Sequence, residues 1–126
     1  MHYVKICMVF ELLYLLREVV KRATQNEVYI PIESLKTAVK ELLEDDNVAI
    51  YPTNTIGNVT EDLKELQKLS FLAMADDKVV INKEMFLNAT RFVERQEELL
   101  KDDRYAMFLF TKLKQRAQRI QFLNRQ

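Results

Sequence analysis

Apolar and polar residues follow one another along this chain with the periods of a helical protein that carries a small sheet. Residues 3–23 are apolar almost throughout and contain no helix breaker, so they predict a helix covered on most sides. Glu11, Glu18 and Arg22 fall in one narrow polar stripe on it. Such a helix either runs through the middle of the domain or leaves a face for a second copy of the chain, and the pattern leaves both open.

A short strand and a helix are expected next. Residues 28–30 are β-prone and are stopped by Pro31, which suits the first turn of a helix. Apolar residues with helical spacing then continue to the polar cluster at 44–47, namely Leu35, Ala38, Val39 and Leu42. A second apolar run at 48–51 predicts an inserted strand.

A second helix and a hairpin follow. Thr60 is a suitable N-cap for a helix of residues 60–68, whose apolar face comprises Val59, Leu63, Leu66 and Leu69. The segments 71–75 and 78–81 have β-prone composition and flank a polar tip at 76–77, so they predict a two-stranded hairpin.

Two long helices complete the pattern. Asn82 is expected to cap a helix of residues 83–100, in which Phe86, Ala89, Val93, Gln96 and Leu100 repeat with heptad spacing. Asp103 is expected to cap a last helix, residues 104–124. The fold class predicted for residues 1–126 is a single, mainly α domain with a winged-helix-like α+β core, a small β wing and long N- and C-terminal helices.

The stretch LKELQKLSFLAMADDKVVIN, residues 63–82, passes from an amphipathic helix through a leucine into a tight hairpin. Together with the strand and helix before it, it resembles the winged-helix family of DNA-binding and regulatory domains over residues 28–82. The resemblance implies a small, cofactor-free transcriptional regulator, with residues 1–24 and 83–126 as flanking helices. The sixteen residues between Leu43 and Thr60 exceed the usual turn of about 3–4 residues, which again indicates an inserted strand.

The charges are balanced in number but unevenly placed. Nineteen basic and nineteen acidic residues give a net charge of zero, yet residues 111–126 contain five bases and no acid. Lys112, Arg116 and Arg119 share one face of the expected last helix, as a phosphate-binding stripe would. The alternative is a solvated face that complements the acidic centre of the chain, where residues 27–79 carry eleven acids and five bases.

The expected recognition helix offers Lys64, Gln67 and Lys68 for contacts with double-stranded DNA. Glu61 and Glu65 share its polar face, and the hairpin tip is acidic, so both groove-facing elements carry groups that repel phosphates. Two functions therefore remain open: a winged-helix DNA-binding regulator, or a winged-helix module that binds or assembles proteins without nucleic acid.

The flanking helices present more apolar surface than a core of about 55 residues covers, which predicts a homodimer. Phe110 and Leu113 are expected at buried positions, either in the interface or in the core.

Catalysis, metal binding and cofactor binding are not expected from these residues. The single histidine is His2, a lone glycine cannot build a phosphate loop, and no metal-ligand spacing occurs. Cys7 lies in an apolar run and suits a small buried side chain in a reducing, cytoplasmic setting. The apolar run that follows Lys5 is interrupted by Glu11 and is too short for a membrane span.

Overall fold

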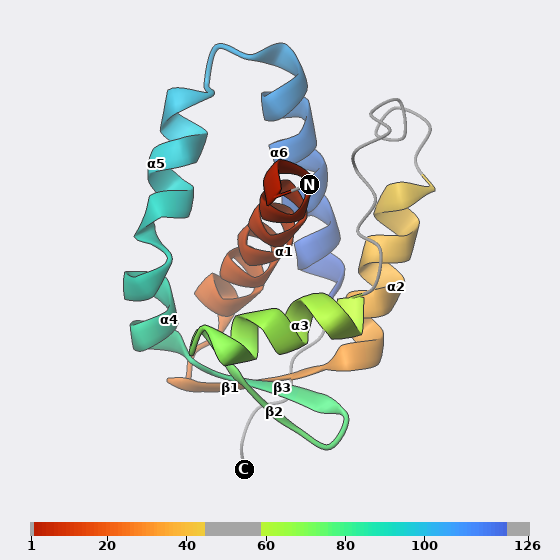
Figure 1. The fold of residues 1–126 in the computed structure, drawn as a ribbon, viewed down its shortest axis with the longest axis vertical. Helices are drawn as coiled ribbons and strands as arrows, with labels where there is room; N and C mark the ends of the chain where they lie inside the picture. The colour runs from red at the N-terminus through yellow and green to blue at the C-terminus, as the bar shows by residue number, and fades with distance from the viewer. Residues whose placement is uncertain (1, 45–58, 121–126) are drawn as a thin grey trace.

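The computed structural model of the chain describes residues 2–44 and 59–120, which form six helices and a three-stranded sheet (Figure 1). In chain order the elements are α1 (His2–Arg22), β1 (Glu27–Pro31), α2 (Ile32–Leu43), α3 (Val59–Lys68), β2 (Ala73–Ala75), β3 (Lys78–Asn82), α4 (Lys83–Ala89), α5 (Arg91–Leu99) and α6 (Arg104–Arg119). The predicted fold class is confirmed: the chain is mainly helical, with a winged-helix-like α+β order from β1 to β3. The strand expected at 48–51 and the helix expected beyond residue 120 lie outside the described residues.

The sheet is antiparallel with the strand order β1-β3-β2. β3 is central and pairs with β1 from Glu27↔Asn82 to Pro31↔Lys78, and with β2 up to Ala75↔Lys78. Pro31 therefore stays in the strand and α2 begins at Ile32, which corrects the expectation that the proline opens the helix. An edge strand tolerates a residue without an N–H donor.

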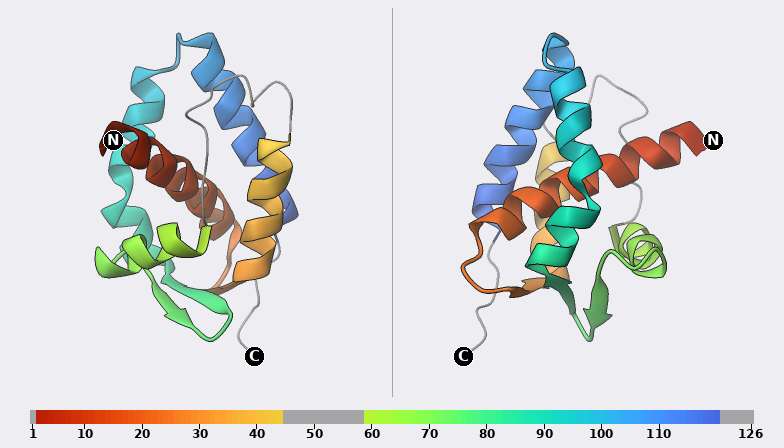
Figure 2. Two further views of the ribbon diagram at one scale, coloured as in Figure 1. Left: turned by 45° about the vertical axis from the view of Figure 1, so that its right-hand side comes forward. Right: turned by 90° about the vertical axis from the view of Figure 1, so that its left-hand side faces the viewer.

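α1 runs through the middle of the domain. Residues 11–17 of this helix are all buried, and the helix contacts α3, α4, α5 and α6 (Figure 2). The first of the two alternatives for this helix is thus confirmed. Glu11 is only 5% exposed, so the expected polar stripe does not reach solvent at that position.

α6 packs along α1 and supplies part of the same core. Phe110 and Leu113 are 2% and 1% exposed, so both belong to the core of one chain and are not surface positions for a partner. The ring of Phe110 also lies 6.1 Å from that of Phe10, centroid to centroid. The apolar face expected on the last helix therefore packs inside the domain.

The prediction of a single helix over residues 83–100 is wrong. The structure has two helices there, α4 and α5, which are separated at Thr90. Arg17 of α1 donates to the carbonyl of Leu87 at 3.0 Å and to the Thr90 hydroxyl at 2.7 Å. In a continuous helix the Leu87 carbonyl would accept from the N–H of Arg91. The buried Arg17 of α1 thus bonds to a carbonyl that would otherwise accept a backbone hydrogen bond in a continuous helix from α4 to α5.

Two of the three expected helix caps are confirmed. The Asn82 side chain accepts from the backbone N–H of Met85 at 3.0 Å, and that of Asp103 from Ala106 at 2.9 Å. The cap expected at Thr60 is wrong, because α3 already begins at Val59 and includes Thr60 in its first turn.

Candidate nucleic-acid interface

α3 is held against the domain by its apolar face and presents its polar face to solvent. Val59, Leu63 and Leu66 are buried, whereas Leu69, which was expected on the same apolar face, is 60% exposed. Lys64, Gln67 and Lys68 are all exposed, as expected from the sequence, and within the described part of the chain their side chains make no hydrogen bond or ion pair. They follow i, i+3, i+4 spacing, which places them on one face of the helix.

The end of α3 is fixed by a Schellman motif centred on Ser70. The N–H of Phe71 donates to the carbonyl of Leu66 at 3.0 Å, and that of Ser70 to Gln67 at 2.9 Å. Ser70 has φ 68°, in the left-handed region where glycine is usual. This tight end turns the chain directly into β2, so the direction of α3 is set by the sheet.

The wing next to α3 is acidic at its tip. Asp76 and Asp77 form the two-residue connection between β2 and β3, and both are exposed. Asp76 has φ 57°, which aspartate adopts more readily than most residues. The Asp77 carbonyl accepts from the N–H of Ile32 at 2.9 Å, so the tip is tied to the start of α2. The Asp77 carboxylate lies 3.6 Å from the ammonium of Lys78, and both aspartates are exposed, so the tip presents acidic groups that repel phosphate.

The three candidate residues of α6 make contacts within the domain. Arg116 and Arg119 lie 3.4 Å and 4.0 Å from a carboxylate oxygen of Glu41 in α2. The ammonium of Lys112 lies 5.4 Å from the centre of the Phe108 ring. These contacts favour the alternative in which the basic face complements the acidic centre of the same chain.

The six candidate residues do not come together. Figure 2 shows α3 and α6 on opposite sides of the molecule, with α1 between them. Lys64, Gln67 and Lys68 therefore do not form one continuous surface with Lys112, Arg116 and Arg119. The structure therefore separates the candidates into an exposed set on α3 and an internally paired set on α6.

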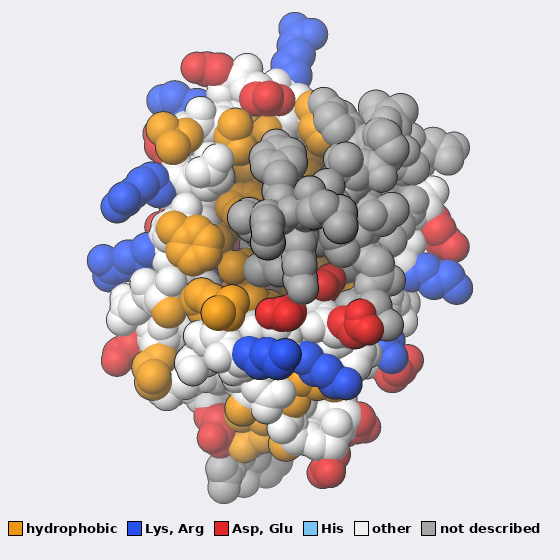
Figure 3. All heavy atoms as spheres, in the orientation of Figure 1, with side chains coloured by type: hydrophobic (Ala, Val, Ile, Leu, Met, Phe, Trp, Pro, Cys, Tyr) orange, Lys and Arg blue, Asp and Glu red, His pale blue; other side chains and the backbone are white. Residues whose placement is uncertain are grey.

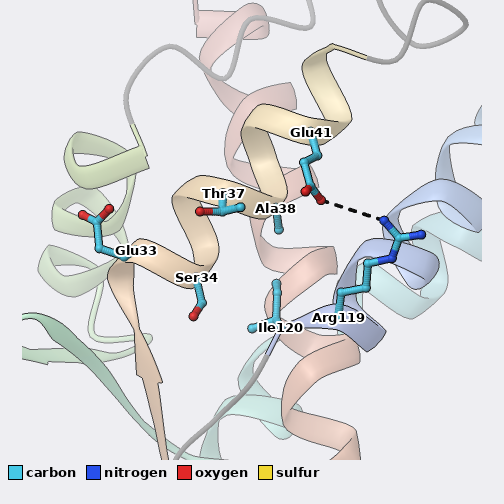
Figure 4. A pocket seen from close by; sticks show the side chains of 7 residues that line it. All are labelled: Glu33, Ser34, Thr37, Ala38, Glu41, Arg119 and Ile120. Atoms are coloured by element: carbon cyan, nitrogen blue, oxygen red, sulfur yellow. Dashed lines mark ion pairs between the residues drawn. The ribbon is translucent and has the colours of Figure 1, made fainter.

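An open pocket of about 340 Å³ lies between α2 and the end of α6 (Figure 4). It is lined by Glu33, Ser34, Thr37, Ala38, Glu41, Arg119 and Ile120. Arg119 points toward Glu41 across it, so the lining is partly polar and partly apolar and has no concentrated charge. Among the described residues, no three His, Cys, Asp or Glu side chains gather as metal ligands would.

Two buried charged residues of α1 were not identified as special from the sequence. Arg17 is 3% exposed and, besides its bonds at the α4–α5 break, forms an ion pair with Glu94. Glu11 is buried with no partner for its Oε2 atom among the described residues, and desolvation raises the pKa of this carboxyl from 4.5 to about 7. The signal was present, because each is a charge in an otherwise apolar run.

Comparison of the chain with known protein families, with curated proteins and with solved structures finds no match. In the described part of the chain no helix has the length and apolarity to cross a membrane.

Proposed function

We propose that this protein binds double-stranded DNA through α3, as a small winged-helix-type transcriptional regulator that needs no cofactor. The observation that carries the proposal is the set of Lys64, Gln67 and Lys68 on the helix that precedes the β2–β3 hairpin, because all three are exposed and have no partner among residues 2–44 and 59–120. A lysine can contact a phosphate or the O6 and N7 acceptors of guanine, and glutamine matches the N6 and N7 groups of adenine. α6 has no part in this interface.

The charges on α3 set the expected strength of binding. Lys64 and Lys68 are the two cations of this face, and Glu61 is exposed on the same helix. Each phosphate contact contributes about −0.9 to the slope of log K against log salt, so two lysines give about −2. Binding is therefore expected to be weak and only moderately salt-dependent.

Titration of a labelled duplex at low salt tests the proposal directly. Lys64→Gln together with Lys68→Gln should abolish most of the affinity and flatten the salt slope. Lys112→Gln with Arg119→Gln serves as the matched control, because both residues belong to α6 on the far side of the domain and the pair also removes two positive charges. Equal loss in both variants would indicate a nonspecific effect of net charge and would contradict an α3 interface.

A second candidate function is a protein-interaction module without nucleic acid. The acidic wing tip at Asp76 and Asp77 favours it, because these carboxylates flank the same surface and suit a basic partner. In that case affinity for the partner should survive neutralisation of Lys64 and Lys68 but fall when the aspartates are neutralised.

A further inference from the structure

α5 carries apolar side chains on two of its faces. Val93 faces the core and is buried. Phe92 and Leu99 lie seven residues apart and therefore share a second face of the same helix. Their side chains are 48% and 73% exposed. Met85, seven residues before Phe92 in α4, is 67% exposed. Figure 3 shows hydrophobic side chains along α4 and α5 at the left of the molecule, with basic side chains projecting beside them.

This outer apolar face is separate from the positions first expected in a dimer interface. Phe110 and Leu113 are enclosed within the chain, so a second copy cannot reach them without unfolding the domain. The outer face of α5 needs no such change. It belongs to a different helix from Lys64 and Lys68 of α3, and the inference below does not depend on the proposed DNA binding.

Charged residues border this face on one flank in a specific order. At about 100° per residue, Arg95, Arg91 and Glu98 lie about 60°, 100° and 120° from Phe92 in the same rotational direction. All three are exposed. Within the described residues Arg95 makes no hydrogen bond or ion pair, Arg91 bonds only to Asn88, and Glu98 pairs with Lys101 in the next turn.

We infer that two copies of this chain pack their α5 helices antiparallel around a twofold axis, with Phe92 of each copy against Leu99 of the other. This register places Glu98 of one copy level with the midpoint between Arg91 and Arg95 of the other, about 3 Å along the axis from each. The twofold repeats the arrangement, so each copy supplies one glutamate and two arginines. The two Arg95 residues meet near the axis, and each turns toward a Glu98.

The contact is small and the dimer is correspondingly weak. Two short helices bury less than the roughly 1,200 Å² of a standard stable interface, so the dimer forms at high protein concentration. Sedimentation of the full chain from about 10 µM to about 500 µM should show a reversible shift from monomer toward dimer. A constant monomer mass over this range would overturn the inference.

Charge reversal tests the register. Glu98→Arg leaves three arginines on the flank of each copy, and Arg91→Glu with Arg95→Glu leaves three glutamates. Like charges then face each other across the interface, so each variant alone should remain monomeric. Mixing the two should restore a dimer of one copy of each, because every opposed pair is then of opposite sign. Formation of the mixed dimer at the concentration where the wild type associates would support the register.

Lys40→Glu provides the matched control. Lys40 is exposed on α2, which lies on the other side of the molecule from α5, and its reversal should leave association unchanged (Figure 1). Circular dichroism of each variant separates loss of association from loss of folding. Association that persists in both α5 variants, or a mixture that stays monomeric, would show that the interface or the register is wrong.

Discussion

The rings of Tyr14 and Phe110 stack with their centroids 4.8 Å apart and their planes 16° from parallel. They join α1 to α6, and the Tyr14 hydroxyl also donates to Glu97 of α5 at 3.0 Å. Burial and the neighbouring Glu97 carboxylate raise the pKa of Tyr14 above its usual range, so the hydroxyl keeps its proton. Three helices thus meet at one aromatic pair.

Phe110→Ala should lower the free energy of unfolding by about 3–5 kcal/mol, the usual cost of removing a buried phenylalanine. Phe110→Asp should prevent folding, because it places an unpaired charge in the same space. Denaturant unfolding measures both, with Gln115→Ala on the exposed side of α6 as the control. A folded Phe110→Asp monomer would mean that Phe110 serves an interface and not the core.

Glu11→Gln should stabilise the protein near neutral pH. The pKa of Glu11 is about 7 in the folded state and about 4.5 in the unfolded state, so the native state holds its proton more tightly. The wild type therefore loses stability, relative to the variant, as pH rises from about 4.5 through 7. A shift of this size corresponds to about 3 kcal/mol above pH 7. Parallel unfolding at pH 4.5 and pH 8 measures the difference, and an equal effect of the substitution at both pH values would contradict it.

Ser70→Gly should stabilise the protein by up to about 1 kcal/mol, because glycine adopts the left-handed conformation at the end of α3 without a Cβ clash. Ser34→Gly in α2 is the matched control and should destabilise by about 0.5–1 kcal/mol, since that residue lies within a helix. Thermal unfolding of the two variants should shift in opposite directions. Destabilisation by both would show that Ser70 does not occupy a left-handed position.

Asp76→Asn with Asp77→Asn should tighten binding of duplex DNA about two- to fivefold at low salt, because two charges that repel phosphates are removed. Asparagine also tolerates the positive φ of Asp76, so the turn is preserved. Binding measured beside the wild type on the same duplex checks this. An unchanged affinity would place the wing away from the DNA.

The elements that could be predicted from the sequence are those determined by neighbouring residues. Asn82 and Asp103 cap helices through atoms three residues away, and the alternation of Val79 and Ile81 marks the buried side of β3. The break at Thr90 could not be predicted, because its cause is Arg17, 73 residues earlier in the chain. Local pattern alone favours one continuous helix there.

The candidate site was predicted in part for the same reason. The exposure of Lys64 and Lys68 follows from the amphipathic pattern of one helix. The pairing of Arg116 with Glu41, 75 residues apart, depends on how α2 and α6 pack, and the spacing of basic residues within α6 carries no information about it. The sequence therefore predicts which residues share a helix face, but not which other element of the fold packs against that face.

The position of α1 at the centre also determines when the domain can fold during synthesis. Arg22 at the end of α1 donates to the carbonyls of Ala117 and Ile120 at 2.5 Å and 2.7 Å, closing a loop of 95 residues in the first case. α1 leaves the ribosome long before α6, and until then one side of this apolar helix has no native cover. The apolar surface of this central helix is consequently exposed on the nascent chain until α6 has emerged, and exposed apolar surface of this kind favours aggregation.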